Sequence, residues 1–523
     1  MTVRRAEPLA AALLTALLAG FHIFFLLRAG GLWRDEAALL NLARGTSAEA
    51  VRAGLKWEPS FPLLFPFVLR GWTALDPARA DEGLRLLGCL IGLLVIAAQW
   101  LGARLEGRSS PILSLTLFGL NPLALRTTDA LRAYGLGVVL VLAASALIHR
   151  AAVSPTPRRL GLAAVAAVLS VQCLYQNAVL LSAVCFAASV VALLDGRRRV
   201  AGAMAGIWGL TVLSILPYLG AAAPAREAKA LIRVPMSLGS IWSGFSEVLS
   251  SPAGAMLLVW IALAVLGAAA GIRRRTGDAL FFLLALAAAV PAYFAFICFL
   301  GINAAFWHFV PLLAVAAFCL EGLLMSPAAG AANSVKAFLA ALLAAVLLVP
   351  SFHGIGVRQT NIDIIARGLE QSAAPDDLIL VNPWYCGTSF QRYYHGRAPW
   401  MSVPPLEDHA LQRWDLLKAR MSSDHPIRPV LDGVKRTLAS GHRVWIVWSP
   451  PHQRAGPKFP PLPPAPGAPS GWYSGPYLIQ WWAQVGDYVR THAGGVSHHP
   501  PVHEGPVNPY EDMRLSSAQG WRP

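Results

Sequence analysis

Long apolar runs dominate the first 350 residues of the chain. A bilayer core about 30 Å thick needs roughly 20 apolar residues per helix, and runs of about this length occur about eleven times. They begin near Pro8, Gly83, Pro111, Arg132, Leu160, Ala178, Ala201, Pro252, Ala279, His308 and Ala337. The stretch at residues 59–72 (PSFPLLFPFVLRGW) is short and interrupted by Pro, so we expect it to be re-entrant or interfacial. The pattern predicts a polytopic α-helical membrane protein.

Basic residues alternate between the connections of these runs. Cytoplasmic loops carry the excess of Lys and Arg in membrane proteins. Every second connection is basic, at Arg104 and Arg108, at Arg150, Arg158 and Arg159, at 197–199, at 273–275 and at Lys336. The connections at 175–177 and 301–306 have no Lys or Arg. This alternation predicts a cytoplasmic N-terminus and places the chain after Pro350 outside the cytoplasm.

The overall composition agrees with a membrane protein and argues against a nucleic-acid partner. Of the 523 residues 55% are hydrophobic and 14% are charged, whereas soluble domains carry roughly 25% charged residues. The formal net charge is +15, but much of it lies in short clusters between apolar runs. There it orients membrane segments, so we expect a lipid bilayer and no nucleic acid as partner.

The part of the chain after residue 356 alternates helix-like and strand-like segments. The segments Leu378–Val381 and Arg443–Trp448 read as strands, so we expect a small α/β domain at 357–450 outside the cytoplasm. Residues 451–523 read as a Pro-rich linker followed by a polar C-terminal segment, to which we assign no regular structure. Its His-rich tract follows no structural zinc spacing and reads as a polar tail (His492, His498, His499, His503, Glu504).

Asp35 and Glu36 follow the first apolar run and stand in an outer loop of about fifty residues, 29–82. Acids in the first turn of a helix interact favourably with its positive end, so this pair could simply begin a helix. The same loop also holds Arg34, Glu58 and the Pro-interrupted segment. A concentration of charge in one outer loop favours a chemical role as the alternative.

Two more groups of polar residues lie where predicted spans reach the extracytoplasmic side of the membrane. Asp129, Arg132 and Tyr134 precede one span, and His308 enters another just before Pro311. Arg132 could reach the interface only to keep its charge in water, and a single interfacial His is often structural. Because both span ends and the first outer loop face the same side, we expect these residues to line one cavity.

The segments that carry these residues resemble a family. The sequences WRDEAALLNLARG, EPSFPLLF, NPLALRTTDALRAYGL and WHFVPLLAV resemble, in order and spacing, membrane glycosyltransferases with the GT-C fold. The similarity is to dolichyl-phosphate-mannose-protein mannosyltransferase-like proteins of glycosyltransferase families 39 and 83, relatives of the lipid A aminoarabinose transferase. It covers most of residues 1–350, and DDLILVNPWYCGTSFQRYYHG resembles the periplasmic domain of such proteins. It implies a GT-C transmembrane domain at 1–356 in a bacterial inner membrane.

The chain departs from the family pattern at two places. Many relatives have Asp-x-His-Pro-Pro where this chain has Glu58 followed by Pro59 and Ser60, so a metal site built on that His is in doubt. Relatives also often have a basic residue and Tyr where this chain has Trp307 and His308.

The resemblance implies transfer of a sugar from a polyprenyl-phosphate donor to an extracytoplasmic protein, lipid or glycan. The acceptor hydroxyl needs a base, for which we expect Asp35, with Glu36 beside it. Attack opposite the phosphate would invert the anomeric centre. Arg132 is expected to bind the leaving phosphate through its guanidinium fork, with Arg34, Tyr134 and His308 as further candidates. Glu58 is a candidate ligand for a divalent cation, because such cations take oxygen ligands.

Two other function classes remain open on the sequence. A transporter or lipid flippase would place ionisable residues near the middle of broken spans, whereas here they gather at the outer ends. A membrane-anchored receptor would rely on the α/β domain, which shows no Gly-rich phosphate loop and no evident catalytic triad.

Overall fold

The computed structural model describes residues 3–58, 61–75, 80–221, 237–274, 276–301, 304–324, 330–448, 462–465, 473–500 and 505–523. Ser60, His503, Glu504 and most of the Pro-rich segment lie outside these residues. The chain divides into two compact units, which are described in turn. The helical unit comprises residues 1–27, 60–220 and 235–356, and the α/β unit comprises 28–59, 221–234 and 357–523.

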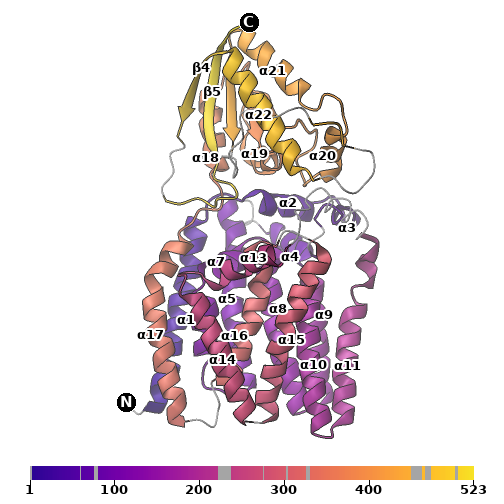
Figure 1. Ribbon diagram of the computed structural model, residues 1–523, viewed down its shortest axis with the longest axis vertical. Coiled ribbons are helices and arrows are strands. Elements are labelled where there is room, and N and C mark those ends of the chain that lie inside the picture. Colours follow the sequence, from indigo (N-terminus) through magenta and orange to yellow (C-terminus); the bar gives the residue numbers. More distant parts are fainter. Residues whose placement is uncertain are drawn as a thin grey trace. The chain divides into compact units, whose positions relative to one another are not determined.

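The helical unit is a bundle of long helices with short ones at its ends (Figure 1). Its elements are α1 (Val3–Arg28), α4 (Leu64–Thr73), α5 (Asp81–Leu105), α6 (Ile112–Ser114), the π-helix η2 (Leu115–Gly119), α7 (Pro122–Asp129), α8 (Ala133–Val153), α9 (Pro157–Cys173), α10 (Asn177–Leu194), α11 (Arg198–Leu213), η3 (Leu216–Ala221), α13 (Leu238–Leu249), α14 (Met256–Arg274), α15 (Gly277–Leu300), η4 (Phe306–Phe309), α16 (Val310–Leu324) and α17 (Gly330–Ile355).

Nine helices of the described chain are long and apolar enough to cross a membrane. They coincide with nine of the expected spans, and they leave large apolar side chains such as Leu13, Leu258 and Phe338 exposed on the bundle. Such side chains are unfavourable in water and suit the hydrocarbon of a bilayer. The prediction of a polytopic helical membrane protein is therefore confirmed.

The other two expected spans take shorter forms. The run that begins near Pro111 is divided into α6, η2 and α7, because Asn121 accepts a hydrogen bond from the backbone N–H of Ala124 and Pro122 starts a new helix. The run near Leu160 forms α9, whose 17 residues extend about 26 Å. The Pro-interrupted segment contains only the ten-residue helix α4, which is too short to span.

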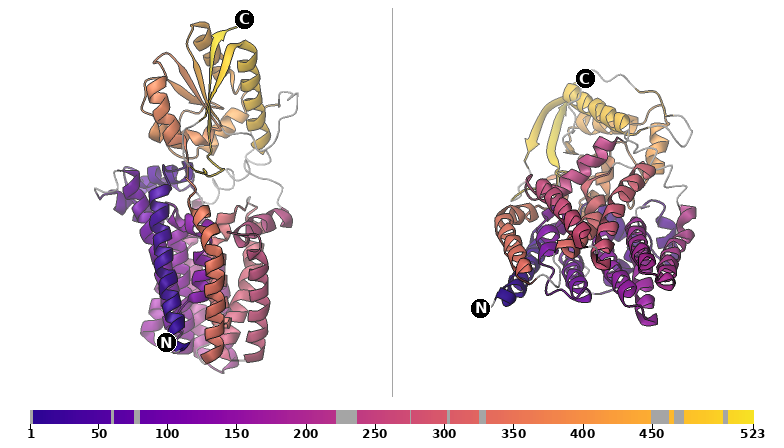
Figure 2. Two further views of the ribbon diagram at one scale, coloured as in Figure 1. Left: turned by 90° about the vertical axis from the view of Figure 1, so that its left-hand side faces the viewer. Right: turned by 60° about the horizontal axis from the view of Figure 1, so that its bottom comes forward.

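The α/β unit contains a five-stranded sheet in the order β2-β1-β3-β5-β4 (Figures 1 and 2). The strands are β1 (Leu378–Asn382), β2 (Trp400–Ser402), β3 (Val444–Trp448), β4 (Ala493–His499) and β5 (Arg514–Trp521). β1 pairs in parallel with β2 and with β3, where Leu378 lies opposite Val444. β5 runs antiparallel to both β3 and β4. The two predicted strands are thus neighbours at the centre of the sheet.

Helices cover both faces of this sheet because the central strands are apolar on both sides. Leu378, Leu380 and Val444 pack with helices α20 (Trp414–Met421), α21 (Arg428–Ala439) and α22 (Gly475–His492). Ile379 and Val381 pack on the other face with α18 (Ile362–Ser372) and α19 (Gly387–Tyr393).

Two features of the α/β unit differ from the sequence pattern. The polar C-terminal segment supplies β4 and β5, where we assigned no regular structure, and His498 and His499 bond to the hydroxyls of Ser516 and Ser517. The first outer loop up to residue 59 also belongs to this unit, with α2 (Arg34–Ala43) and α3 (Ala48–Gly54). The residues around Asp35 are therefore positioned by contacts with chain segments more than 300 residues away.

Candidate functional site

Helix α2 begins at Arg34, immediately before the acidic pair, and Glu36 closes its first turn. The Glu36 carboxylate accepts a hydrogen bond from the backbone N–H of Trp33 at 3.2 Å, and Glu36 is fully buried. Acids in a first turn also meet the positive end of the helix. Glu36 thus has a structural task that accounts for its position.

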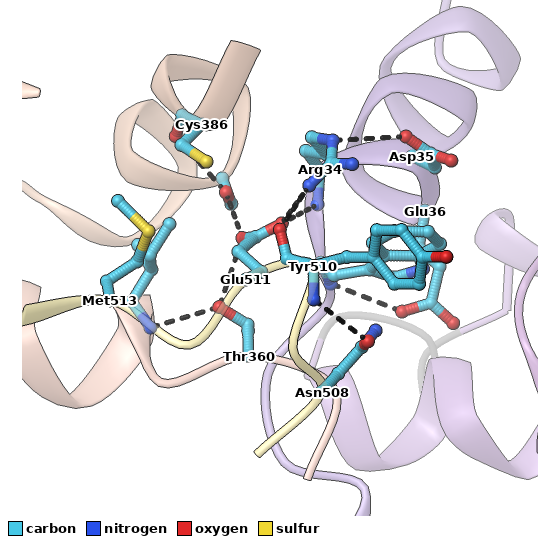
Figure 3. A network of polar contacts seen from close by, with 12 residues as sticks. Arg34, Asp35, Glu36, Thr360, Cys386, Asn508, Tyr510, Glu511 and Met513 are labelled. Atoms are coloured by element: carbon cyan, nitrogen blue, oxygen red, sulfur yellow. Dashed lines mark hydrogen bonds and ion pairs between the residues drawn. The ribbon is translucent and has the colours of Figure 1, made fainter. Parts of the chain in front are cut away.

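Several groups of the α/β unit contact the Arg34 side chain (Figure 3). Its Nη1 donates to the backbone carbonyl of Tyr510 at 2.7 Å, and its Nε lies 3.6 Å from Asp35 Oδ1. The guanidinium also lies over two aromatic rings, 5.0 Å from the centre of Trp33 and 4.5 Å from that of Tyr385. Burial alone would lower its pKa, but Asp35 and the other acidic neighbours raise it above the ordinary value.

Glu511 is the buried acidic partner of Arg34, and no motif in the sequence marks it. Its Oε2 accepts the backbone N–H of Arg34 at 2.9 Å and lies 3.7 Å from Nη1 of the same residue. Its Oε1 accepts the hydroxyls of Thr360 at 3.0 Å and of Ser389. Burial raises the pKa of Glu511 to about 7, although Arg34 and the hydrogen-bond donors favour the ionised form. No local pattern in the polar C-terminal segment distinguishes this Glu from a solvated one.

Asp35 receives a hydrogen bond from a second segment of the same unit. Gln412 Nε2 donates to Asp35 Oδ1 at 2.9 Å, and nearby Asn41 on α2 donates to the carbonyl of Ala410. The Asp35 side chain is 13% exposed. Arg34 Nε and Gln412 Nε2 therefore both approach the same oxygen, Oδ1, of this carboxylate.

Glu58 is buried just after α3, and its backbone N–H bonds to the carbonyl of Leu55. Within the described residues no three His, Cys, Asp or Glu side chains are grouped so that they could hold a metal ion. Ser60, where relatives often have His, lies outside those residues.

Tyr134 contacts both Arg132 and His308 in the helical unit. Arg132 is the N-cap residue of α8, and its guanidinium lies 5.2 Å from the centre of the Tyr134 ring. The Tyr134 and His308 rings meet edge to face with centres 6.2 Å apart. The His308 carbonyl accepts hydrogen bonds from Tyr293 and Gln176.

Asp129, near Arg132 in the sequence, forms a buried pair with His22 of α1. His22 Nδ1 lies 2.8 Å from both carboxylate oxygens of Asp129. This approach depends on two glycines of α5. A Cβ at Gly92 would lie 2.2 Å from Asp129 Oδ1 and 2.3 Å from His22 Nδ1, and one at Gly88 would lie 1.9 Å from the Asp129 carbonyl. Nothing in the sequence pointed to His22 as the partner.

The predicted site residues thus form two groups. Arg34, Asp35, Glu36 and Glu58 belong to the α/β unit. Arg132, Tyr134 and His308 belong to the helical unit.

No family model and no curated protein matches this chain. Solved structures do match its fold. ArnT from Cupriavidus metallidurans bound to undecaprenyl phosphate aligns with a TM-score of 0.51 and 13% identity, over 97% of each chain. The apo form of that protein aligns with a TM-score of 0.50 and 14% identity, over 84% of this chain and 93% of ArnT.

A second solved protein shares the architecture. The Archaeoglobus fulgidus oligosaccharyltransferase in complex with Zn and sulfate aligns with a TM-score of 0.51 and 13% identity, over 83% of this chain and 68% of that one. This chain therefore has the GT-C fold shared by ArnT and the oligosaccharyltransferase.

Proposed function

We propose that the protein is a membrane glycosyltransferase that transfers a sugar from a polyprenyl-phosphate-linked donor to an acceptor outside the cytoplasm. The observation that carries this proposal is the fold likeness to ArnT bound to undecaprenyl phosphate, which extends over 97% of both chains. The oligosaccharyltransferase likeness supports the same class of reaction.

Arg132 is the group we assign to the donor phosphate. Its guanidinium can bind two phosphate oxygens in a fork, and it stands at the positive end of the 21-residue helix α8, where anions are favoured. Tyr134 and His308 supply polar groups beside it. These groups would stabilise the negative charge that develops on the leaving lipid phosphate.

Asp35 is the group we assign as general base. It takes the proton from the acceptor hydroxyl while that oxygen forms a bond to the anomeric carbon of the donor sugar. The bond from the anomeric carbon to the phosphate oxygen breaks at the same time, and the lipid phosphate leaves with the electron pair. One displacement of this kind inverts the anomeric configuration.

Two of the other candidates have roles that support this base. Arg34 contacts Asp35 and Glu511, so we assign it to holding the base instead of binding the donor phosphate. Glu36 caps the start of α2, so we assign it to stabilising the helix that carries Asp35.

A divalent cation has no complete protein ligand set in the described chain. The Zn complex of the oligosaccharyltransferase makes a cation conceivable for this fold, with Glu58 as one oxygen ligand. No step of the proposed reaction depends on it.

The donor and acceptor can be identified together by mass spectrometry of cell-envelope glycans and lipids from strains with and without the gene. Loss of one defined sugar from one class of molecule is the expected result. Unchanged envelope glycans, with accumulation of a small molecule on one side of the membrane, would instead indicate a transporter.

Asp35→Asn tests the base directly. Asn keeps the size of Asp and can still accept the hydrogen bond from Gln412 at Oδ1, so the variant should fold and insert normally. Its turnover with the identified donor should fall by roughly 10²–10⁴-fold, the usual scale for loss of a general base. Glu36→Gln in parallel should show a smaller defect. A well-folded Asp35→Asn protein with near-normal transfer would refute Asp35 as the base.

A further inference from the structure

Glu511 connects the C-terminal segment to the first residue of α2. It lies just before β5, and its carboxylate bonds to the backbone N–H of Arg34, the residue that begins the helix (Figure 3). Tyr510 adds a second link through its carbonyl, which accepts from the Arg34 side chain. The start of α2 is therefore held by residues 476 and 477 positions away in the chain.

The carboxylate of Glu511 is itself fixed by hydrogen bonds. Thr360 and Ser389 donate to one oxygen, and Arg34 donates to the other. Glu511 has no exposed surface, so each of these bonds forms away from water and its loss would leave a buried polar group unsatisfied. The contact is built into the interior of the α/β unit.

Asp35 is one step further along the same chain of contacts. The Arg34 guanidinium lies between Glu511 and Asp35, with its Nη1 3.7 Å from the first and its Nε 3.6 Å from the second. Gln412 donates to the same Asp35 oxygen, Oδ1. Movement of the Arg34 side chain would therefore remove one of the contacts that orient Asp35.

We propose that Glu511 is a positioning residue for Asp35, and that the C-terminal segment of the α/β unit thereby orders the loop that carries the base. This inference rests on the proposed role of Asp35. Glu511 does not touch the reacting atoms in this scheme. It fixes Arg34, and Arg34 fixes the carboxylate that takes the proton.

The charge on Glu511 should make this positioning sensitive to pH near neutrality. The titratable and charged groups that face it are Arg34 from α2 and Tyr385 and Cys386 from the segment before α19. Burial raises the pKa of Tyr385 to about 12 and that of Cys386 well above its ordinary value, so neither ionises near pH 7. Glu511, whose pKa is about 7, is protonated below that pH and then attracts Arg34 less strongly.

The test compares Glu511→Gln with the wild-type protein and with Glu407→Gln, an exposed acid of the same unit. Gln keeps the size and one of the two acceptor oxygens, but its NH₂ group donates where the other carboxylate oxygen accepted, and it never carries charge. We expect turnover to fall by roughly 10- to 100-fold, because a displacement of about 1 Å at a reacting group can cost that much. Binding of undecaprenyl phosphate, used as the probe for the donor site, should stay within about twofold, since Arg132 is untouched. Glu407→Gln should match the wild type in both.

The pH profile separates positioning from a general loss of structure. Wild-type turnover should rise as the pH passes through about 7, whereas Glu511→Gln should be low and flat across the same range. The free energy of unfolding should instead decrease as the pH rises. Folding raises the pKa of Glu511 above 4.5, so the stability that Glu511 contributes is fully present below pH 4.5 and is lost as the pH rises through about 7. Glu511→Gln should remove this slope.

Hydrogen exchange of the amides in residues 29–43 gives a readout that does not depend on activity. Exchange should become faster in Glu511→Gln and stay unchanged in Asp35→Asn. Faster exchange together with an active Asp35→Asn protein would refute the proposed base while leaving the tether in place. Glu511→Gln could instead have the same turnover, pH profile and hydrogen exchange as the wild type while Asp35→Asn is inactive. That result would refute the positioning role alone.

Discussion

Single residues in the Arg34–Glu36 cluster have different roles although they are adjacent in the sequence. The Glu36 carboxylate accepts a hydrogen bond at the start of its own helix. Arg34 and Asp35 instead contact Glu511 and Gln412. The helix-start interpretation of the acidic pair therefore applies to Glu36, and the chemical role of Asp35 is a proposal. Glu36 has the contacts of a helix cap, and Asp35 has those of an oriented carboxylate.

Arg132 is the residue whose proposed role is easiest to separate from its charge. Arg132→Lys keeps the positive charge but loses the planar fork, so we expect clearly weaker binding of undecaprenyl phosphate and slower turnover. Arg132→Ala should be worse still. Native mass spectrometry in lipid nanodiscs can measure the binding. If both variants bind and turn over normally, Arg132 only places its charge at the membrane interface.

At the scale of elements, close helix contacts in the helical unit depend on glycines. Gly88 and Gly92 are one turn apart on α5, and together they allow α7 and α1 to approach closely enough for the pairing of Asp129 with His22. Small residues at such spacing let membrane helices pack tightly. The interrupted span that ends in α7 is thereby packed against the two continuous helices α5 and α1.

Gly92→Ala should destabilise the helical unit by several kcal/mol. The added methyl would overlap the pair and force it apart. Overpacking a core costs about 1–3 kcal/mol, and leaving a buried polar group without its hydrogen bond costs about 1–3 kcal/mol more. Thermal unfolding in detergent measures the effect. Gly206→Ala on α11 is the matched control, because a Cβ there meets nothing within 4 Å. Equal unfolding temperatures for both variants would contradict the close packing.

For the whole molecule, the basic connections predict which ends of the bundle face the cytoplasm. Reporters that are active on only one side of the membrane can test this. A fusion after Arg199 should be cytoplasmic, and a fusion after Pro523 should be external, because an odd number of expected crossings separates the N-terminus from residue 356. Both reporters on the same side would refute the orientation and with it the access of Asp35 to an extracytoplasmic acceptor.

The membrane bundle, the two central strands and the position of the acidic pair can be predicted from the amino-acid sequence. These features are encoded locally. An apolar run of spanning length has few other stable environments, and the apolar residues of β1 and β3 require cover on both faces.

The partners of the polar residues, by contrast, become visible only in the folded chain. β4 and β5 are largely polar and lie at one side of the sheet, so they lack the apolar pattern of a buried strand. The pairs Arg34 with Glu511 and His22 with Asp129 join residues 477 and 107 positions apart. A buried charge must find a complementary group, but its sequence neighbourhood does not specify which one. That choice depends on which segments the packed core brings together.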